Sequence, residues 1–385
     1  MSGPTVVTCA RAPPQIGGTG TVMYELLGHF PKESIVLIMR AQRAGISRDD
    51  RVLDVKTFEV GSATSATYKS AFRMAMIPLL IISMLRRIRS LEKPPRNMLA
   101  VHPDLDFLVA SIIVSKILVL PISVYLHDTI VEAATGLADR WPARFAERFV
   151  FARARKVYSM SVPMTEYYRG LGRETETLPH GVNPELMRAP SLEACSAKPK
   201  VGFAGVVYNT NGSALRDLVS AKEASKDSFQ IHITTSAQSI PYLRQLGILD
   251  KLDSVQTLRI HSEVLDFLAG CDVLFVPMSF ESQNYKDLLT IFPTKVTDYW
   301  LAQRPIIVYG PREYAFVSLA EQDGYAKVVS ERSPEAIAKA ISDLCADAGL
   351  RKRLVSASRK MARIHDGNAV ASKLIADLGI VREGV

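Results

Sequence analysis

Short apolar runs alternate with amphipathic stretches along the whole chain. Such alternation is typical of repeated β–α units built on parallel sheets. In the first half, the predicted strands are Thr5–Cys9, Ser34–Met39, Asn97–Val101, Ile122–Leu126 and Lys156–Ser159. Helical patterns fall between them, at Thr19–His29, Asp106–Lys116 and Ala143–Ala152.

A second alternating series begins near residue 200. Its predicted strands are Lys200–Phe203, Phe229–Thr234, Ser254–Leu258, Val273–Pro277, Pro305–Tyr309 and Ala326–Val329. Its predicted helices are Ser213–Ala224, Ser239–Leu246, Ser262–Ala269, Phe292–Leu301, Arg312–Glu321 and Ser333–Ala346.

The segment between the two series breaks the pattern and suggests two domains. Leu178–Met187 contains Pro, Gly and Asn and is expected to form a hinge, followed by a linker at Ala189–Pro199. We therefore expect an α/β protein with Rossmann-like domains at 1–188 and 198–365. A last helix at Val370–Leu378, within residues 366–385, is expected to return to the first domain. Ligands of open α/β sheets bind at the carboxyl ends of the strands, so a cleft between the domains is the expected site.

Composition agrees with a globular protein and excludes several classes. The chain has 385 residues, 48% of them apolar, and its four cysteines form no metal-binding or disulfide pattern. The first residues lack the features of a signal peptide. The longest apolar run, Met74–Leu85, is well short of the roughly 20 residues that span a bilayer. These features favour a cytoplasmic protein.

Positive charge is concentrated in one segment. Residues 69–96 contain seven Lys or Arg and one acid, Glu92, within a net charge of +8. Basic residues beside Leu, Ile and Met are typical of helices that contact anionic lipid. The segment therefore predicts peripheral attachment to the inner membrane face, with a buried helix that has a solvated basic end as the alternative. No nucleic-acid-binding motif accompanies it, and no nucleic-acid partner is expected.

A glycine cluster, Gly17, Gly18 and Gly20, follows the first predicted strand. Glycines there let a ligand approach the backbone, and a helix N-terminus attracts anions. The spacing fits neither a Rossmann nor a Walker motif. A tight turn without a ligand is the alternative.

A polar pair, His127 and Asp128, ends the strand Ile122–Leu126. At a strand's carboxyl end, His127 can donate a hydrogen bond to a sugar hydroxyl or to developing negative charge. Asp128 and Glu281, which follows the strand Val273–Pro277, are the candidates for a general base.

The most informative segment runs from Phe292 to Tyr299. Pro293 suits the first turn of a helix, whose amides, together with Thr294 and Lys295, would hold a diphosphate. Asp298 lies one turn after Lys295 and is placed to accept hydrogen bonds from a ribose. A surface Lys–Asp pair is the alternative.

In order along the chain, several segments together resemble those of GT-B-fold glycosyltransferases. They are PPQIGGTG (13–20), His127, LPHGV (178–182), VGFAG (201–205), VPMSFES (276–282), FPTKVTDYWLAQRPIIV (292–308) and RIHDGNAVASKL (363–374). The chain is most similar to their large retaining, family 4-like group, which uses nucleotide-diphosphate sugars. The resemblance implies that Lys295 binds the donor diphosphate and Asp298 the ribose, that His127 contacts the transferred sugar, and that the three glycines lie over the phosphates. It also implies catalysis without a metal or other cofactor.

Two departures from that group stand out. Thr290 occupies the position of the first Glu of the group's Glu-x7-Glu pair, while Asp298 occupies the second, and Glu281 is the candidate substitute. The loop after Gly205 lacks the group's basic pair, which leaves Asn211 and loop amides as its expected replacement.

The expected function is hexosyl transfer from a nucleotide-diphosphate sugar to an acceptor hydroxyl, in glycan or glycolipid assembly. The acceptor is expected to be a glycan or a lipid-linked sugar. A sugar-nucleotide epimerase and a catalytically silent GT-B scaffold are the alternatives. The sequence does not distinguish the nucleotide base.

Overall fold

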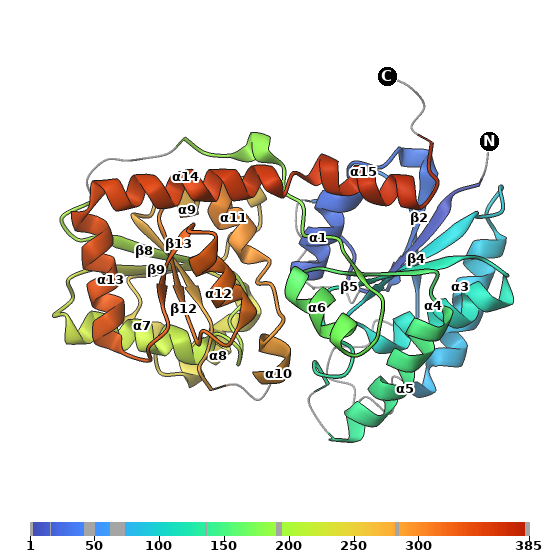
Figure 1. Ribbon diagram of the computed structural model, residues 1–385, viewed down its shortest axis with the longest axis horizontal. Helices are drawn as coiled ribbons and strands as arrows, with labels where there is room; N and C mark the ends of the chain where they lie inside the picture. The colour runs from blue at the N-terminus through green and yellow to red at the C-terminus, as the bar shows by residue number, and fades with distance from the viewer. Residues whose placement is uncertain are drawn as a thin grey trace. The chain divides into compact units, whose positions relative to one another are not determined.

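The computed structural model describes residues 3–15, 17–41, 51–61, 74–134, 137–189, 195–281 and 285–381. The chain divides into two compact domains, residues 1–181 with 367–385 and residues 182–366 (Figure 1).

The first domain is an open parallel sheet with the strand order β3-β2-β1-β4-β5-β6-β7. Its strands are β1 (Thr5–Cys9), β2 (Ile35–Arg40), β3 (Lys56–Val60), β4 (Asn97–His102), β5 (Ile122–Leu126), β6 (Lys156–Ser159) and β7 (Glu176–Thr177). Its helices are α1 (Gly18–Leu27), α3 (Ile77–Arg89), α4 (Leu105–Ile117), α5 (Leu137–Arg153), α6 (Val162–Gly170) and α15 (Gly367–Asp377). The central strands β1, β4 and β5 are buried throughout, because helices cover both faces of a parallel sheet.

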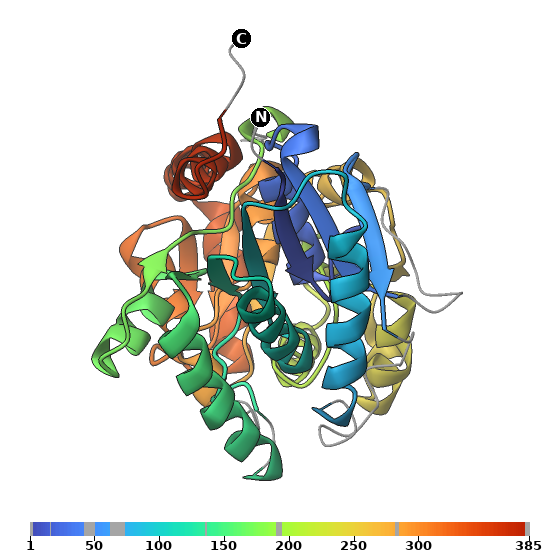
Figure 2. The same cartoon turned by 90° about the vertical axis from the view of Figure 1, so that its right-hand side faces the viewer.

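One layer of this covering consists of α3, α4 and α5, which lie side by side (Figure 2). Their apolar faces and the strands share one hydrophobic core, to which α3 contributes Leu80 and Met84, α4 Phe107 and α5 Val150.

The second domain is also an open parallel sheet, with the strand order β10-β9-β8-β11-β12-β13. Its strands are β8 (Lys200–Ala204), β9 (Gln230–Thr234), β10 (Ser254–Gln256), β11 (Val273–Pro277), β12 (Ile306–Tyr309) and β13 (Ala326–Val329). Its helices are α7 (Gly212–Ala224), α8 (Ile240–Gln245), α9 (His261–Ala269), α10 (Tyr285–Leu288), α11 (Lys295–Ala302), α12 (Ala315–Gln322), α13 (Pro334–Ala346) and α14 (Ala348–Ile364). Two apolar clusters, one containing Trp300 and the other Phe203, form its core.

Strand order reverses at one point in each sheet, between β1 and β4 in the first and between β8 and β11 in the second. The loops that leave these strands diverge at the carboxyl edge and create the crevice where open α/β sheets bind ligands. Each domain thus has one expected site of its own.

The domain boundary falls earlier than residue 188, where the sequence suggested that it lies. The Val182 amide donates to the His365 carbonyl at 2.7 Å, and the Arg188 amide to the Leu301 carbonyl at 2.8 Å. Residues 182–188 therefore form part of the second domain, although they precede the linker. Residue 366, which the sequence assigned to the first domain, also belongs to the second, because Asp366 pairs with Val182.

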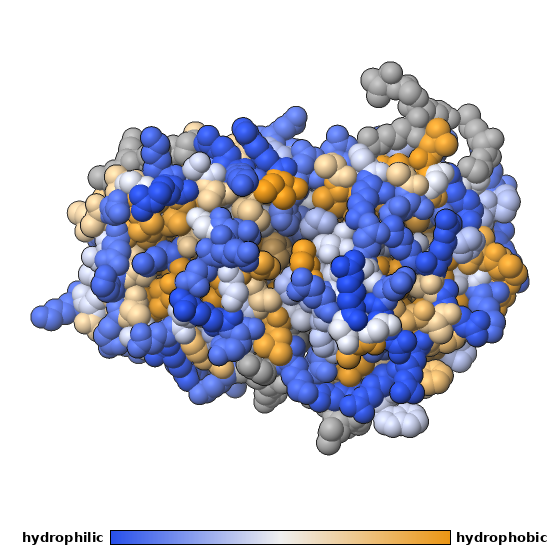
Figure 3. Space-filling model, viewed as in Figure 1, coloured by the Kyte–Doolittle hydropathy of each residue, from blue (hydrophilic) through white to orange (hydrophobic). Residues whose placement is uncertain are grey.

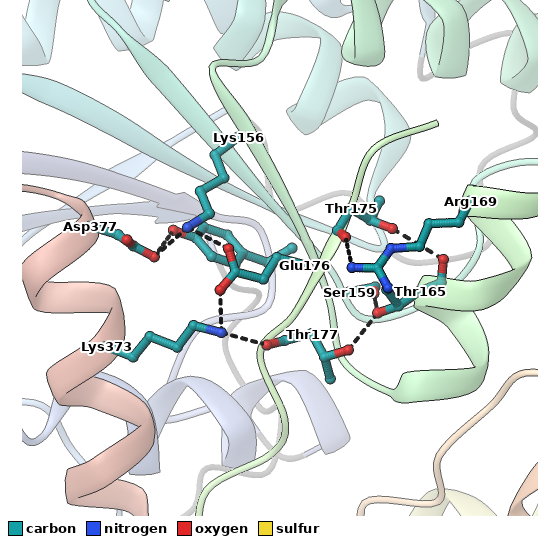
Figure 4. A network of polar contacts seen from close by, with 10 residues as sticks. Lys156, Ser159, Thr165, Arg169, Thr175, Glu176, Thr177, Lys373 and Asp377 are labelled. Atoms are coloured by element: carbon teal, nitrogen blue, oxygen red, sulfur yellow. Dashed lines mark hydrogen bonds and ion pairs between the residues drawn. The ribbon is translucent and has the colours of Figure 1, made fainter. Parts of the chain in front are cut away.

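The last helix, α15, is fixed to the first domain by a polar network (Figure 4). The Asp377 carboxylate accepts hydrogen bonds from Lys156 and Tyr158, each at 2.7 Å. Lys373 pairs with Glu176 on β7 and donates to the Thr177 carbonyl at 3.1 Å. The chain therefore returns to the sheet in which it began.

No helix among the described residues is both long and apolar enough to cross a bilayer.

Candidate active site

The strand-reversal point of the first domain carries an ion pair. Arg11 follows β1 and Asp104 follows β4, and the Arg11 Nε donates to the Asp104 carboxylate at 2.8 Å. Asp104 is only 4% exposed, whereas the Arg11 side chain is about half exposed. The pair therefore places a positive group at the expected crevice.

His127 lies at the carboxyl end of β5, the strand next to β4, and is buried. Burial, together with the nearby His180 and His102, lowers the pKa of His127 to about 3. Its ring packs edge-on against Tyr125 at 4.4 Å, and neither ring nitrogen has a hydrogen-bond partner among the described residues. His127 is thus a neutral imidazole at physiological pH, suited to hydrogen bonding with a hydroxyl rather than to donating a proton as an acid.

Asp128 follows His127 and is half-buried. Burial raises the pKa of this carboxyl, the positive charge of Arg11 opposes the rise, and the negative charge of Asp104 adds to it. A raised pKa makes a carboxylate a better proton acceptor. The chemistry of Asp128 therefore agrees with a role at an acceptor hydroxyl.

The glycine cluster surrounds the start of α1. Gly17 has φ +146°, which side chains rarely adopt, and its carbonyl accepts a hydrogen bond from the Thr21 amide at 3.0 Å. Gly18 is the first residue of α1. A Cβ atom on Gly20 would lie 2.3 Å from the Gln15 carbonyl oxygen, so this glycine permits close packing of helix and loop. Local packing thus accounts for Gly20, and contact of these residues with phosphates stays a prediction.

In the second domain, Lys295 lies under the loop that leaves β8. Its Nζ is 4.5 Å from the centre of the Phe203 ring, and a Cβ atom on Gly205 would lie 3.3 Å from the same nitrogen. Burial lowers the pKa of Lys295 to about 7. Within the described ranges, no carboxylate pairs with this lysine. A buried lysine at the strand-reversal point, without a carboxylate partner among the described residues, is suited to gain a proton and receive an anion.

Asp298 contacts His261 rather than Lys295. Its Oδ1 lies 2.8 Å from the His261 Nε2, and both side chains are mostly buried. The alternative of a surface Lys–Asp pair is therefore wrong. Because His261 begins α9, this contact joins the starts of α9 and α11 at one edge of the domain.

Helix α11 begins at Lys295, two residues after Pro293, so the predicted start at Phe292 is wrong. A tighter turn precedes it, in which the Val296 amide donates to the Pro293 carbonyl at 3.0 Å. The Thr297 amide donates to the carbonyl of Thr294, the N-cap residue, at 3.3 Å. These two amides are thus hydrogen-bonded within the chain. Fewer backbone amides of the first turn are therefore free to bind a diphosphate than the sequence suggested.

Asn211 organises its own loop. Its carbonyl oxygen accepts from the Tyr208 amide and its side-chain nitrogen donates to the Val206 carbonyl, both at 3.0 Å. The residue is 3% exposed. The amide nitrogen carries a second N–H, so contact between Asn211 and a diphosphate stays a prediction, and the two hydrogen bonds add a role in loop support.

Glu281 is 78% exposed and pairs with Arg332 at 2.7 Å. Arg332 follows β13 and also lies 3.5 Å from Asp217 on α7. The structure therefore brings a basic residue to the loop after β11, although the loop after β8 has none.

Several residues of these edges were not anticipated. They are Arg11, His102, Asp104, His180 and His261. Arg11, Asp104 and His102 all lie at or just after the ends of β1 and β4, so reading the carboxyl end of every predicted strand identifies them. His180 and His261 depend on tertiary packing and carry no such signal.

No group of three or more His, Cys, Asp or Glu side chains in the described parts of the chain has the arrangement of a metal site.

Comparison with solved structures identifies the fold. Sucrose-phosphate synthase from Thermosynechococcus elongatus superposes with a TM-score of 0.74 at 14% identity, covering 98% of this chain and 99% of that one. Anabaena Alr3699/HepE in complex with UDP-glucose gives 0.72 at 14% identity, covering 98% and 100%. A glycosyltransferase from Rickettsia africae gives 0.64 at 12% identity, covering 100% of both chains.

No family model matches the chain, and no curated protein sequence matches it. At these low sequence identities, the structural similarity shows a shared fold. The chain has the GT-B fold of these glycosyltransferases, with two Rossmann-like domains.

Proposed function

We propose that the chain is a glycosyltransferase that moves a hexosyl group from a nucleotide-diphosphate sugar to an acceptor hydroxyl. The observation that carries the proposal is Lys295, a buried lysine at the reversal point of the second sheet that pairs with no carboxylate among the described residues. The GT-B fold supports it, since HepE with the same fold has been solved with UDP and with UDP-glucose.

In this proposal the donor lies along the second domain. Lys295 pairs with the diphosphate, because a dianion restores the charge balance that burial disturbs. Asp298, held by His261, accepts hydrogen bonds from the ribose. Glu281, after β11, and Arg332, after β13, add a charged pair. A metal ion is not needed for this charge balance, and activity in excess EDTA tests that point.

The acceptor side is assigned to the first domain. His127 hydrogen-bonds the transferred sugar, and Asp128 contacts the acceptor hydroxyl. We propose transfer with retention of configuration, in which the leaving phosphate takes the acceptor proton. Most of the rate enhancement then comes from positioning and from charge stabilisation.

We further propose that the acceptor is a glycan or lipid-linked sugar at the cytoplasmic membrane face. The support is the basic segment 69–96, whose exposed Arg86 and Arg89 lie at the end of α3. Residues 69–73 of this segment lie outside the described residues.

A thermal-shift screen against UDP, GDP, ADP, CMP and TDP tests the donor assignment. Binding at a Kd of ~100 μM or better stabilises the second domain by mass action at millimolar ligand. Stabilisation by one nucleoside diphosphate is expected, and the absence of any shift contradicts the proposal. Incubation of the matching nucleotide sugar without acceptor separates an epimerase, which yields an isomer, from a transferase.

The stereochemistry has a separate test in Asp128→Asn. If the leaving phosphate is the base, the variant keeps activity within about tenfold of the native protein. A loss of about 10²–10⁴-fold identifies Asp128 as a general base and contradicts retention. The anomeric configuration of the product, read by NMR, distinguishes the two routes independently.

A further inference from the structure

Helix α5 has an exposed face that the proposed reaction does not use. Trp141 is 77% exposed and Phe145 68% exposed, one helical turn apart. Phe149 continues the row and stacks on Phe145 at 6.5 Å with nearly parallel rings. We call Trp141, Phe145, Arg144 and Arg148 the aromatic face of α5.

The opposite side of α5 is fully used in packing. Ala143, Ala146 and Val150 are at most 1% exposed, so the helix is firmly seated in the first domain. The exposure of two large aromatic residues therefore does not arise from a loosely attached helix. Large exposed apolar side chains in one row mark an interaction surface.

The charges around this row select its partner. Arg144 and Arg148 are exposed, and within the described residues neither pairs with a carboxylate. The two acidic residues of the helix, Asp139 and Glu147, are half-buried and buried. Figure 3 shows hydrophilic side chains, in blue, over most of the region around α5. A face with arginines and without exposed carboxylates fits an anionic partner, and it disfavours a second copy of itself.

A second apolar pair lies in the same layer on α3, which α4 separates from α5. Leu79 is 56% exposed and Ile82 46% exposed on α3, with exposed Arg86 and Arg89 in its last turns. Both helices run antiparallel to the strands of a β–α unit, so their first halves lie near the carboxyl edge of the sheet. Leu79, Ile82 and Trp141 lie in those first halves, nearer the edge that holds His127 and Asp128, and Phe145 lies at the middle of α5.

We infer that the aromatic face of α5 inserts into the headgroup region of an anionic phospholipid bilayer. Trp and Phe bury in the interface, and Arg144 and Arg148 pair with lipid phosphates. The inference rests on the proposed function only where it takes the acceptor to be lipid-linked, and it adds an aromatic anchor to the basic segment 69–96.

Tryptophan fluorescence provides the test, since the chain has two tryptophans. Trp300 is fully buried, so changes on adding vesicles report Trp141. With vesicles of phosphatidylcholine and phosphatidylglycerol, emission is expected to shift to shorter wavelength and to be quenched by brominated acyl chains. Vesicles of phosphatidylcholine alone are expected to bind less.

Two double variants are compared. Trp141→Ser/Phe145→Ser is the test, and Val162→Ser/Leu171→Ser is the control. The control pair is exposed elsewhere in the first domain, each residue at 52%. By flotation, the first variant is expected to bind vesicles about tenfold or more weakly, and the control to bind as the native protein does. Circular dichroism of both variants checks that they fold.

Three results overturn the inference. They are absence of vesicle binding by the native protein, equal binding by the Trp141→Ser/Phe145→Ser variant, and a native dimer that this variant converts to a monomer. UDP binding by the second domain is measured on the same samples. If UDP binds and vesicles do not, the membrane inference fails alone, whereas failure of nucleotide binding concerns the proposed function.

Discussion

At the residue scale, burial sets the chemistry of the charged groups in both sheets. Burial lowers the pKa of Lys295 to about 7 and that of His127 to about 3, through the same loss of solvation of the cationic form. The consequences differ in the proposed reaction. There Lys295 regains its charge when the diphosphate binds, whereas His127 stays neutral and offers hydrogen bonds.

The buried histidines predict acid sensitivity of the first domain. The pKa of His102 is lowered to about 4, and burial is again the largest cause. As the pH falls below about 6.5, histidines of the unfolded chain bind protons, while His102 and His127 stay neutral in the folded chain. Stability is therefore complete above about pH 6.5 and is lost as the pH falls toward 4. At pH 5 each histidine lowers the free energy of unfolding by at most about 2 kcal/mol.

Denaturant unfolding of the native protein and of His127→Gln at pH 7.5 and pH 5.0 measures this effect. The variant is expected to lose less stability on acidification than the native protein. His29→Gln serves as the control, since His29 lies in the same domain but is not among the histidines that lower the pKa of His127. An unchanged pH dependence in His127→Gln contradicts the assignment of a depressed pKa.

At the element scale, the loop between β8 and α7 shapes the proposed donor site. Gly205 has φ +137°, and a Cβ atom there would lie 3.2 Å from the Lys295 Cε. Asn211 closes the other end of the loop through its two hydrogen bonds. The loop therefore depends on one residue without a side chain and on one buried amide.

Gly205→Ala is expected to weaken UDP binding by about tenfold or more, because the new methyl group displaces Lys295 and strains the backbone. Calorimetric titration with UDP measures it. Gly324→Ala is the control, since its φ is +66° but no atom lies within 4 Å of the added carbon. Equal affinities for UDP in the native protein and Gly205→Ala contradict the placement of the diphosphate beside this loop.

Asn211→Ala is expected to lower the free energy of unfolding of the second domain by about 1–3 kcal/mol, because two backbone groups lose their partner. Thermal unfolding measures the loss. Its effect on UDP affinity is expected to be smaller than that of Gly205→Ala, because the substitution leaves Lys295 in place. A larger loss of affinity in Asn211→Ala than in Gly205→Ala contradicts this order and indicates direct contact of Asn211 with the nucleotide.

Sequence patterns predicted the strands well because buried parallel strands have a simple signature. β1, β5, β6, β11 and β13 begin and end where their apolar runs do. β3 was missed because three of its five residues are exposed and only Val60 is buried, as in an edge strand. The start of α11 was misplaced because Pro293 is equally suited to the tight turn that precedes the helix.

The site was less predictable than the fold. Lys295 stands out from its segment, but its burial depends on Phe203 and Gly205, some ninety residues earlier. The internal use of Asn211 and the contact of His261 with Asp298 follow from packing that no local pattern encodes.

At the scale of the whole molecule, the chain leaves the first domain once and returns to it through α15. The hydrogen bonds and ion pair of Asp377 are expected to stabilise the packing of α15 against the first domain. Asp377→Ala removes two hydrogen bonds to one carboxylate, and amide hydrogen exchange in α15 is expected to accelerate by about tenfold or more. Asp343→Ala, which breaks the exposed Lys339 pair in α13, is the control and is expected to leave α15 unchanged.

The central claim is that Lys295 receives the donor diphosphate, and proton-linked calorimetry tests it most directly. At pH 8, titration with UDP in buffers of different ionisation enthalpy is expected to show uptake of nearly one proton, since binding recharges a lysine whose free pKa is about 7. Lys295→Met is expected to lose this uptake and to weaken binding at least tenfold at pH 7, whereas Lys352→Met, exposed on α14, is expected to change neither. UDP binding by Lys295→Met with native affinity and native proton uptake would contradict the account.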